Sequence, residues 1–181
     1  MLQSIEYYVC PDGSINVKPE NKAMYVYTID RRSLTQEMLV LIRDLYPQAF
    51  AALAEMYAKS RPNRPYYEYR IVHRFIRCNF GEYDTLSIDV AKDGCLNLEE
   101  VHCPLRGECK LEGVVCKPCL ETALTERETE VAHLIAQGLS RQDVADELDI
   151  SVYTVNRHVQ NIKARLHLHT TAQLITRFNN R

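Results

Sequence analysis

The sequence predicts a mixed α+β domain over residues 1–100 and an all-α domain of four helices over residues 122–181. Two observations predict this division. Ten of the eleven tyrosines precede residue 84, among short apolar runs typical of mixed strands and helices. The region after residue 122 instead contains four apolar stripes at helical spacing, each behind a residue type that begins helices.

The composition is that of an ordinary soluble globular protein. Of 181 residues, 46% are hydrophobic and 25% are charged, which are average values. No run approaches the about 18 consecutive apolar residues that a membrane span needs. The first ten residues also lack the basic start and apolar run of a signal peptide. We therefore expect no membrane association and a location in the bacterial cytoplasm.

Short strands are predicted at the start of the chain, over residues 5–9 and 24–29, which are rich in tyrosine, valine and isoleucine. Between them, Pro11, Asp12 and Gly13 have turn chemistry. The hydrophobic pattern then changes from strand to helical spacing.

Two helices are predicted after these strands. Ser33 and Gln36 have the spacing of a capping box, and the apolar stripe behind them ends near Leu45. Pro47 ends or kinks that helix, or begins a second one that runs to about residue 59.

A long strand is predicted over residues 66–78, because aromatic and apolar side chains alternate there with charged ones. Shorter strands are expected over residues 84–90 and 94–99, with Asp93 and Gly94 as a hairpin turn. This order lacks the regular strand–helix alternation of a phosphorylation receiver. The domain is instead expected to sense a signal or to dimerise.

A cysteine-rich segment, residues 101–121, is interpreted as a hinge between the domains. The chain has seven cysteines, which is many for a compartment that keeps thiols reduced, so metal binding is the leading explanation. Four thiolates match the tetrahedral preference of zinc, the expected cofactor. The predicted ligands are Cys103, Cys109, Cys116 and Cys119, with Cys78 as a substitute for Cys119 and His102 as a substitute for a cysteine.

Two other interpretations of these cysteines stay open. An iron–sulfur cluster uses the same ligands. Alternatively, the cysteines are reduced, half-buried side chains that act as small apolar groups.

Four helices are predicted after residue 122, each with a local start signal. A serine or threonine precedes each apolar stripe, and in three cases an acid or glutamine follows three residues later. The start signals are Thr125 with Glu128, Ser140 with Asp143, Ser151 alone, and Thr170 with Gln173, while Gly138 ends the first helix and residues 149–151 form a tight turn.

The second and third of these helices, joined by that tight turn, form a helix-turn-helix. The sequence resembles LuxR/GerE-type DNA-binding domains at L-T-x-R-E-x-E-V over residues 124–131 and I-A-x-G-L-S over residues 135–140. The resemblance continues as V-A-x-x-L-x-I-S-x-x-T-V-x-x-H-x-x-N-I over residues 144–162. It covers about a third of the chain and implies a transcription regulator, not an enzyme, whose third helix enters the major groove of double-stranded DNA.

The resemblance also implies partners. Such domains commonly bind DNA as homodimers, with the fourth helix at or near the dimer contact. The first domain would then sense a signal, hold two copies together or touch RNA polymerase.

Charge supports a nucleic-acid partner. Residues 121–150 hold eight acids and two bases, whereas residues 151–181 hold five bases and no acid. Three residues on the third helix have side chains suited to reading bases, Asn156, Arg157 and Gln160. Six more are expected to contact phosphates, namely Ser140, Tyr153, Thr154, Lys163, Arg165 and His169.

Two other functions remain as alternative hypotheses. The helix-turn-helix of an adaptor would dock on RNA polymerase or another regulator without reading DNA. A thiol- or metal-based redox sensor would control transcription through the cysteines. A metalloenzyme is not expected, because no H-x-E motif accompanies the C-x-x-C spacing at Cys116 and Cys119.

Overall fold

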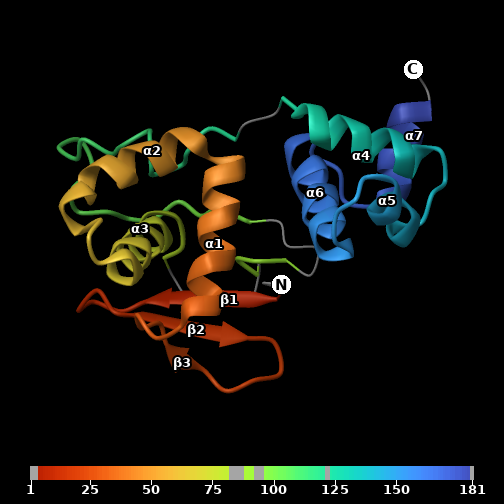
Figure 1. Ribbon diagram of the computed structural model, residues 1–181. Helices are drawn as coiled ribbons and strands as arrows, with labels where there is room; N and C mark the ends of the chain where they lie inside the picture. The colour runs from red at the N-terminus through yellow and green to blue at the C-terminus, as the bar shows by residue number, and fades with distance from the viewer. Residues whose placement is uncertain (1–3, 82–87, 92–95, 121–122, 180–181) are drawn as a thin grey trace. The chain divides into compact units, whose positions relative to one another are not determined.

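The computed structural model describes residues 4–81, 88–91, 96–120 and 123–179. Contacts divide the chain into two compact units, residues 1–119 and 120–181, and each is described by itself (Figure 1). The cysteine-rich segment up to Cys119, interpreted above as part of a hinge, lies in the first unit. Within the described ranges, no helix combines the length and apolar character that crossing a membrane requires.

The first unit begins with an antiparallel sheet of three strands in the order β1-β2-β3. The strands are β1 (Ile5–Val9), β2 (Ile15–Pro19) and β3 (Tyr25–Val26). Tyr7 pairs with Val17, and both side chains are fully buried. β1 and the short β3 fall within predicted strands, whereas β2 was not expected. Its alternation of Ile15 and Val17 with polar residues is the strand signal that was missed.

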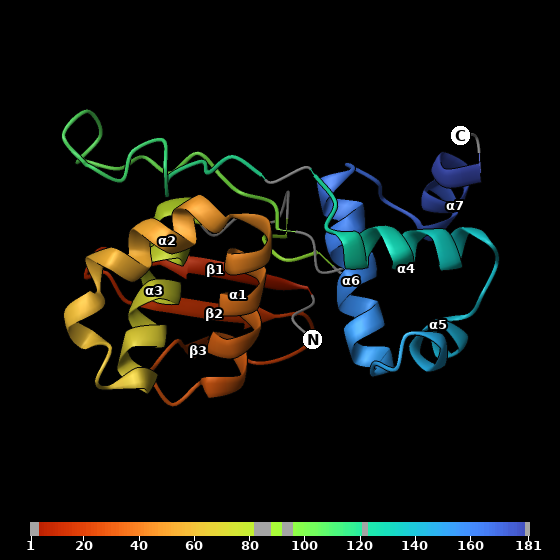
Figure 2. The same cartoon turned by 45° about the horizontal axis from the view of Figure 1, so that its top comes forward.

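Helices α1 (Arg32–Leu45), α2 (Pro47–Met56) and α3 (Arg64–Asn79) form the rest of this unit, with a 3-10 turn η1 (Ala58–Ser60) between the last two. Figure 2 shows them gathered over the sheet. The two helices predicted for this region are confirmed as α1 and α2, and Pro47 occupies the first turn of α2. The predicted capping box at Ser33 is wrong, because α1 begins at Arg32 without a side-chain cap.

The predicted strand over residues 66–78 is also wrong, because these residues belong to α3. The buried positions of α3 recur every three or four residues. Asn63 caps the helix by accepting a hydrogen bond from the Tyr66 amide (3.3 Å), and proline stands in the first turn. Of the strands predicted over residues 84–90 and 94–99, residues 84–87, 94 and 95 lie outside the described ranges, as does the Asp93–Gly94 turn. Of the rest, Val90 forms isolated bridges to Ile5 and Leu96.

The second unit is helical, with α4 (Glu126–Ala136), α5 (Arg141–Glu147), α6 (Val152–Arg165) and α7 (Thr171–Asn179). The capping boxes at Thr125 and Ser140 and the cap at Ser151 are confirmed. At α7, the Thr170 hydroxyl accepts from the Gln173 amide (3.1 Å). The apolar core is shared by all four helices and consists of Val131, Ala132, Ile135, Val144, Ala145, Val155, Val159, Ile162 and Leu174.

Candidate nucleic-acid interface

The turn between α5 and α6 is fixed by backbone and side-chain hydrogen bonds. Asp149 adopts a left-handed conformation (φ 49°), and the Ile150 amide donates to the Ala145 carbonyl at 3.0 Å, which closes the end of α5. Ser151 then accepts from the Thr154 amide at 3.1 Å and begins α6. Arg127 of α4 donates to the Leu148 carbonyl at 2.6 Å. These bonds fix the end of α5 and the start of α6, and they attach the turn between them to α4.

One side of α6 is buried and the opposite side is not. Val155, Val159 and Ile162 are at most 1% exposed and pack into the core. The opposite side, which we call the outward face, carries Tyr153, Asn156, Arg157 and Gln160. Tyr153 is 51% exposed and the other three are half-buried. The structure thus brings the three predicted base readers together on one helix face, while their contact with DNA stays a prediction.

Arg141, at the first position of α5, is a neighbour of this face that sequence reasoning missed. Its guanidinium donates to Asn156 Oδ1 at 2.5 Å, and the residue is exposed. The sequence signal was available, since a base directly after the Ser140 cap departs from the acid-rich run of residues 121–150. Arg141 extends the positive charge of the outward face onto α5.

Two of the predicted phosphate contacts do not reach the surface. Lys163 is 6% exposed and Arg165 is 4% exposed. Arg165 lies 3.3 Å from the Glu128 carboxylate and donates to the Ala123 carbonyl at 3.0 Å, so it joins the end of α6 to the start of α4. We therefore correct the assignment of Arg165 from a phosphate contact to a structural one. The burial of Lys163 argues against its predicted phosphate contact as well.

The other four predicted phosphate contacts are placed differently. Tyr153, Ser140 and His169 are exposed, and Thr154 is half-buried. Ser140 is engaged in its capping box, where its hydrogen bonds hold the pKa of Asp143 below the ordinary value. The Thr154 hydroxyl bonds the Ser151 hydroxyl at 2.8 Å. Phosphate contacts by these four residues stay predictions.

The predicted metal ligands lie in the first unit. Cys78, Cys103, Cys109 and Cys116 line one cavity of about 20 Å³, whereas Cys119 is exposed and does not line it. Burial raises the pKa of the Cys78 thiol to about 12, so without a cation this thiol is protonated at neutral pH. Among the described residues, the carboxylate oxygens of Glu6, Asp89 and Glu99 lie within 4.8 Å of one another. No three of the described cysteine sulfurs lie this close together.

Comparison with known proteins concerns the second unit. Residues 122–178 match the family described as bacterial regulatory proteins, luxR family. The nitrate/nitrite response regulator protein NarP of Escherichia coli (strain K12) is 45% identical over 47 residues, which are 26% of this chain and 22% of NarP. The response regulator protein VraR of Staphylococcus aureus is 42% identical over 52 residues, 29% of this chain and 25% of VraR.

The chain therefore spans about a quarter of the length of the curated relatives it matches. No solved structure matches it.

Proposed function

We propose that this chain, whose residues 122–178 form a LuxR-family domain, is a sequence-specific DNA-binding transcription regulator that places α6 in the major groove. The observation that carries the proposal is the outward face of α6, which lies opposite the buried stripe of a fixed helix-turn-helix. An α-helix fits the major groove, and its first half usually meets the base edges. Asn156 and Arg157 lie in that part of α6, and Gln160 follows about one helical turn after Asn156.

The side chains of the outward face suit base recognition. A guanidinium donates two hydrogen bonds to the paired acceptors of guanine, and the amides of asparagine and glutamine match the acceptor and donor of adenine. Asn156 is already oriented by Arg141, which lowers the entropy lost when the amide binds a base. Arg141 itself carries a charge that suits a phosphate oxygen next to the groove.

A homodimer on DNA is part of the proposal. The inner side of α7 is fixed by buried Leu174 and by Phe178, whose ring meets His133 edge-on at 5.2 Å. Its outer side presents small and polar residues, including Ala172, Gln173 and Thr176, which permit a close approach of a second helix. Two copies would read half-sites about one helical turn of DNA apart.

Replacing Arg157 by alanine is expected to cost about 1–3 kcal/mol of binding energy on the preferred site and to relax the preference at one base pair. The measurement is binding-site selection from a random duplex library with the purified full chain. Arg43→Ala serves as the control, because it removes an arginine that is 55% exposed on α1 of the other unit.

Unchanged site preference in the Arg157→Ala variant would contradict the base-reading assignment. If the parent chain selects no DNA but captures RNA polymerase or another regulator, the adaptor function holds instead.

A further inference from the structure

We propose that Cys78, Cys103, Cys109 and Cys116 bind one zinc ion, and that Cys119 is not a ligand. The four side chains come from α3 and from two turns of the cysteine-rich segment, yet they line a single cavity. This ligand set replaces the last cysteine of the C-x-x-C pair by a cysteine from the preceding helix. The inference concerns the first unit alone and does not depend on DNA binding.

Asn79 brings Cys78 and Cys116 together. Asn79 is fully buried at the end of α3, directly after Cys78. Its side-chain amide donates to the Val115 carbonyl at 2.8 Å, and its oxygen accepts from the Lys117 amide at 3.0 Å. These two hydrogen bonds hold the backbone in place on both sides of Cys116. The pairing of Cys78 with Cys116 is thus built into the fold.

The backbone after Cys116 leads Cys119 away from the cavity. Lys117 takes a left-handed conformation (φ 50°), and the chain beyond it leads to an exposed Cys119. Val115 and Leu111, by contrast, are buried and anchor the segment that carries Cys109 and Cys116. The C-x-x-C spacing therefore does not place both thiols at one site.

The size of the cavity favours a single ion. Its volume is about 20 Å³, close to the roughly 10–15 Å³ that one water molecule needs. An iron–sulfur cluster, with several iron and sulfide atoms, requires more room. Val101 and Leu105 form the apolar part of the cavity wall. A structural zinc site is closed by four protein ligands and binds no water, and the four cysteines can supply these ligands.

Binding requires the sulfurs to move closer together, since zinc–sulfur bonds are about 2.3 Å long. Residues 104–108, which connect Cys103 with Cys109, are all exposed, so a shift of this turn does not disturb the buried core. An ion can enter from the adjoining hollow of about 540 Å³, which Cys78, Cys103 and Cys116 also line.

Arginine offsets the charge of the proposed site. Four thiolates and a divalent ion leave a net charge of about −2. The guanidinium of Arg74 lies one turn before Cys78 on α3 and reaches Cys109 Sγ at 4.0 Å. Arg106 lines the cavity itself. Such outer groups orient thiolate ligands and tune the affinity for the metal.

The test is elemental analysis of the full-length chain, purified reduced and without chelator. We expect about one zinc per chain in the parent and in the control variant Cys119→Ser. We expect a loss of roughly tenfold or more in Cys78→Ser. Equal zinc in the parent and Cys78→Ser, with loss in Cys119→Ser, would overturn the ligand set.

A measurement on the parent chain covers the case in which Cys78→Ser fails to fold. Alkylation followed by mass spectrometry should label Cys119 in the zinc-loaded chain while Cys78, Cys103, Cys109 and Cys116 stay protected until a chelator is added. Iron in place of zinc, a disulfide between Cys78 and Cys116, or equal labelling with and without chelator would each overturn the proposal.

Discussion

Replacing Arg165 by methionine is expected to lower the free energy of unfolding of the second unit by about 3–5 kcal/mol. Glu128 and Arg165 have side chains that are 3% and 4% exposed. Removing the guanidinium therefore leaves a carboxylate that water cannot reach easily, and that cost exceeds the lost attraction. Hydrogen exchange of the α6 amides measures the effect in this unit.

Two further variants separate the ion pair from a general loss of packing. Arg177→Met makes the same change at an exposed position of α7 and should alter stability by about 0.5 kcal/mol or less. The double variant Glu128→Gln/Arg165→Met removes the unpaired charge and keeps a side-chain oxygen that accepts from the Thr125 amide, so it should be more stable than Arg165→Met alone. Strictly additive losses would contradict a buried ion pair.

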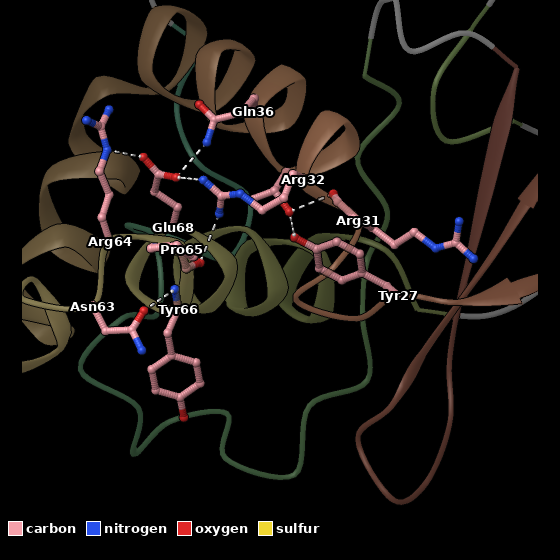
Figure 3. A network of polar contacts seen from close by, with 10 residues as sticks. Tyr27, Arg31, Arg32, Gln36, Asn63, Arg64, Pro65, Tyr66 and Glu68 are labelled. Carbon is pink, nitrogen blue, oxygen red and sulfur yellow. Dashed lines mark hydrogen bonds and ion pairs between the residues drawn. The ribbon is translucent and has the colours of Figure 1, made fainter.

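Replacing Glu68 by glutamine is expected to lower the free energy of unfolding of the first unit by about 2–3 kcal/mol at neutral pH. Its side chain is 4% exposed and accepts hydrogen bonds from Arg32 (2.6 Å), Gln36 (2.5 Å) and Arg64 (2.8 Å). Figure 3 shows the carboxylate between these three donors, so Glu68 ties α1 to the start of α3. The contact with Arg64 contributes little of this, because the Arg64 side chain is 81% exposed and water screens its charge.

The effect should depend on pH with a definite sign. Burial raises the pKa of Glu68, but the hydrogen bonds from Arg64, Arg32 and Gln36 outweigh burial and lower the pKa below its ordinary value. A carboxyl group with a lowered pKa in the folded state stabilises the protein above its unfolded pKa of about 4.3. That contribution is lost as the pH falls through the folded value.

Urea unfolding of the parent and Glu68→Gln chains at pH 7 and in acid measures this dependence. The stability difference between them should shrink in acid, because the parent carboxyl group becomes protonated. Glu55→Gln, at an exposed position of α2, is the matched control and should change stability little at either pH. A difference that is constant over this range would show that the charge of Glu68 is not what stabilises the unit.

The second unit could be predicted well because its signals are local. Thr125, Ser140 and Ser151 each bond an amide three residues away, so the cap is readable from a few neighbouring letters. The outward face of α6 followed from the buried stripe by helical spacing alone. The burial of Arg165 could not be predicted in the same way, because its partner Glu128 lies on another helix.

The first unit was harder to predict, because the sequence of α3 fits both the strand pattern and the helix pattern. Tyr67, Tyr69 and Ile71 alternate with charged residues as in a strand, while the side chains that become buried recur at helical spacing. Only packing against α1 and the sheet decides between these periods. The cap at Asn63 was the local signal that favoured the helix. Cys78 was nevertheless included among the candidate ligands predicted from the sequence, as a substitute for Cys119.

The salt dependence of DNA binding by the full chain tests most directly whether the helix-turn-helix binds DNA. Each phosphate contact should contribute a slope of about −0.9 in a plot of log affinity against log salt. We expect a steep negative slope for the parent chain and a slope shallower by about one unit for Arg141→Ala. Absence of DNA binding, or an affinity independent of salt, would contradict the account.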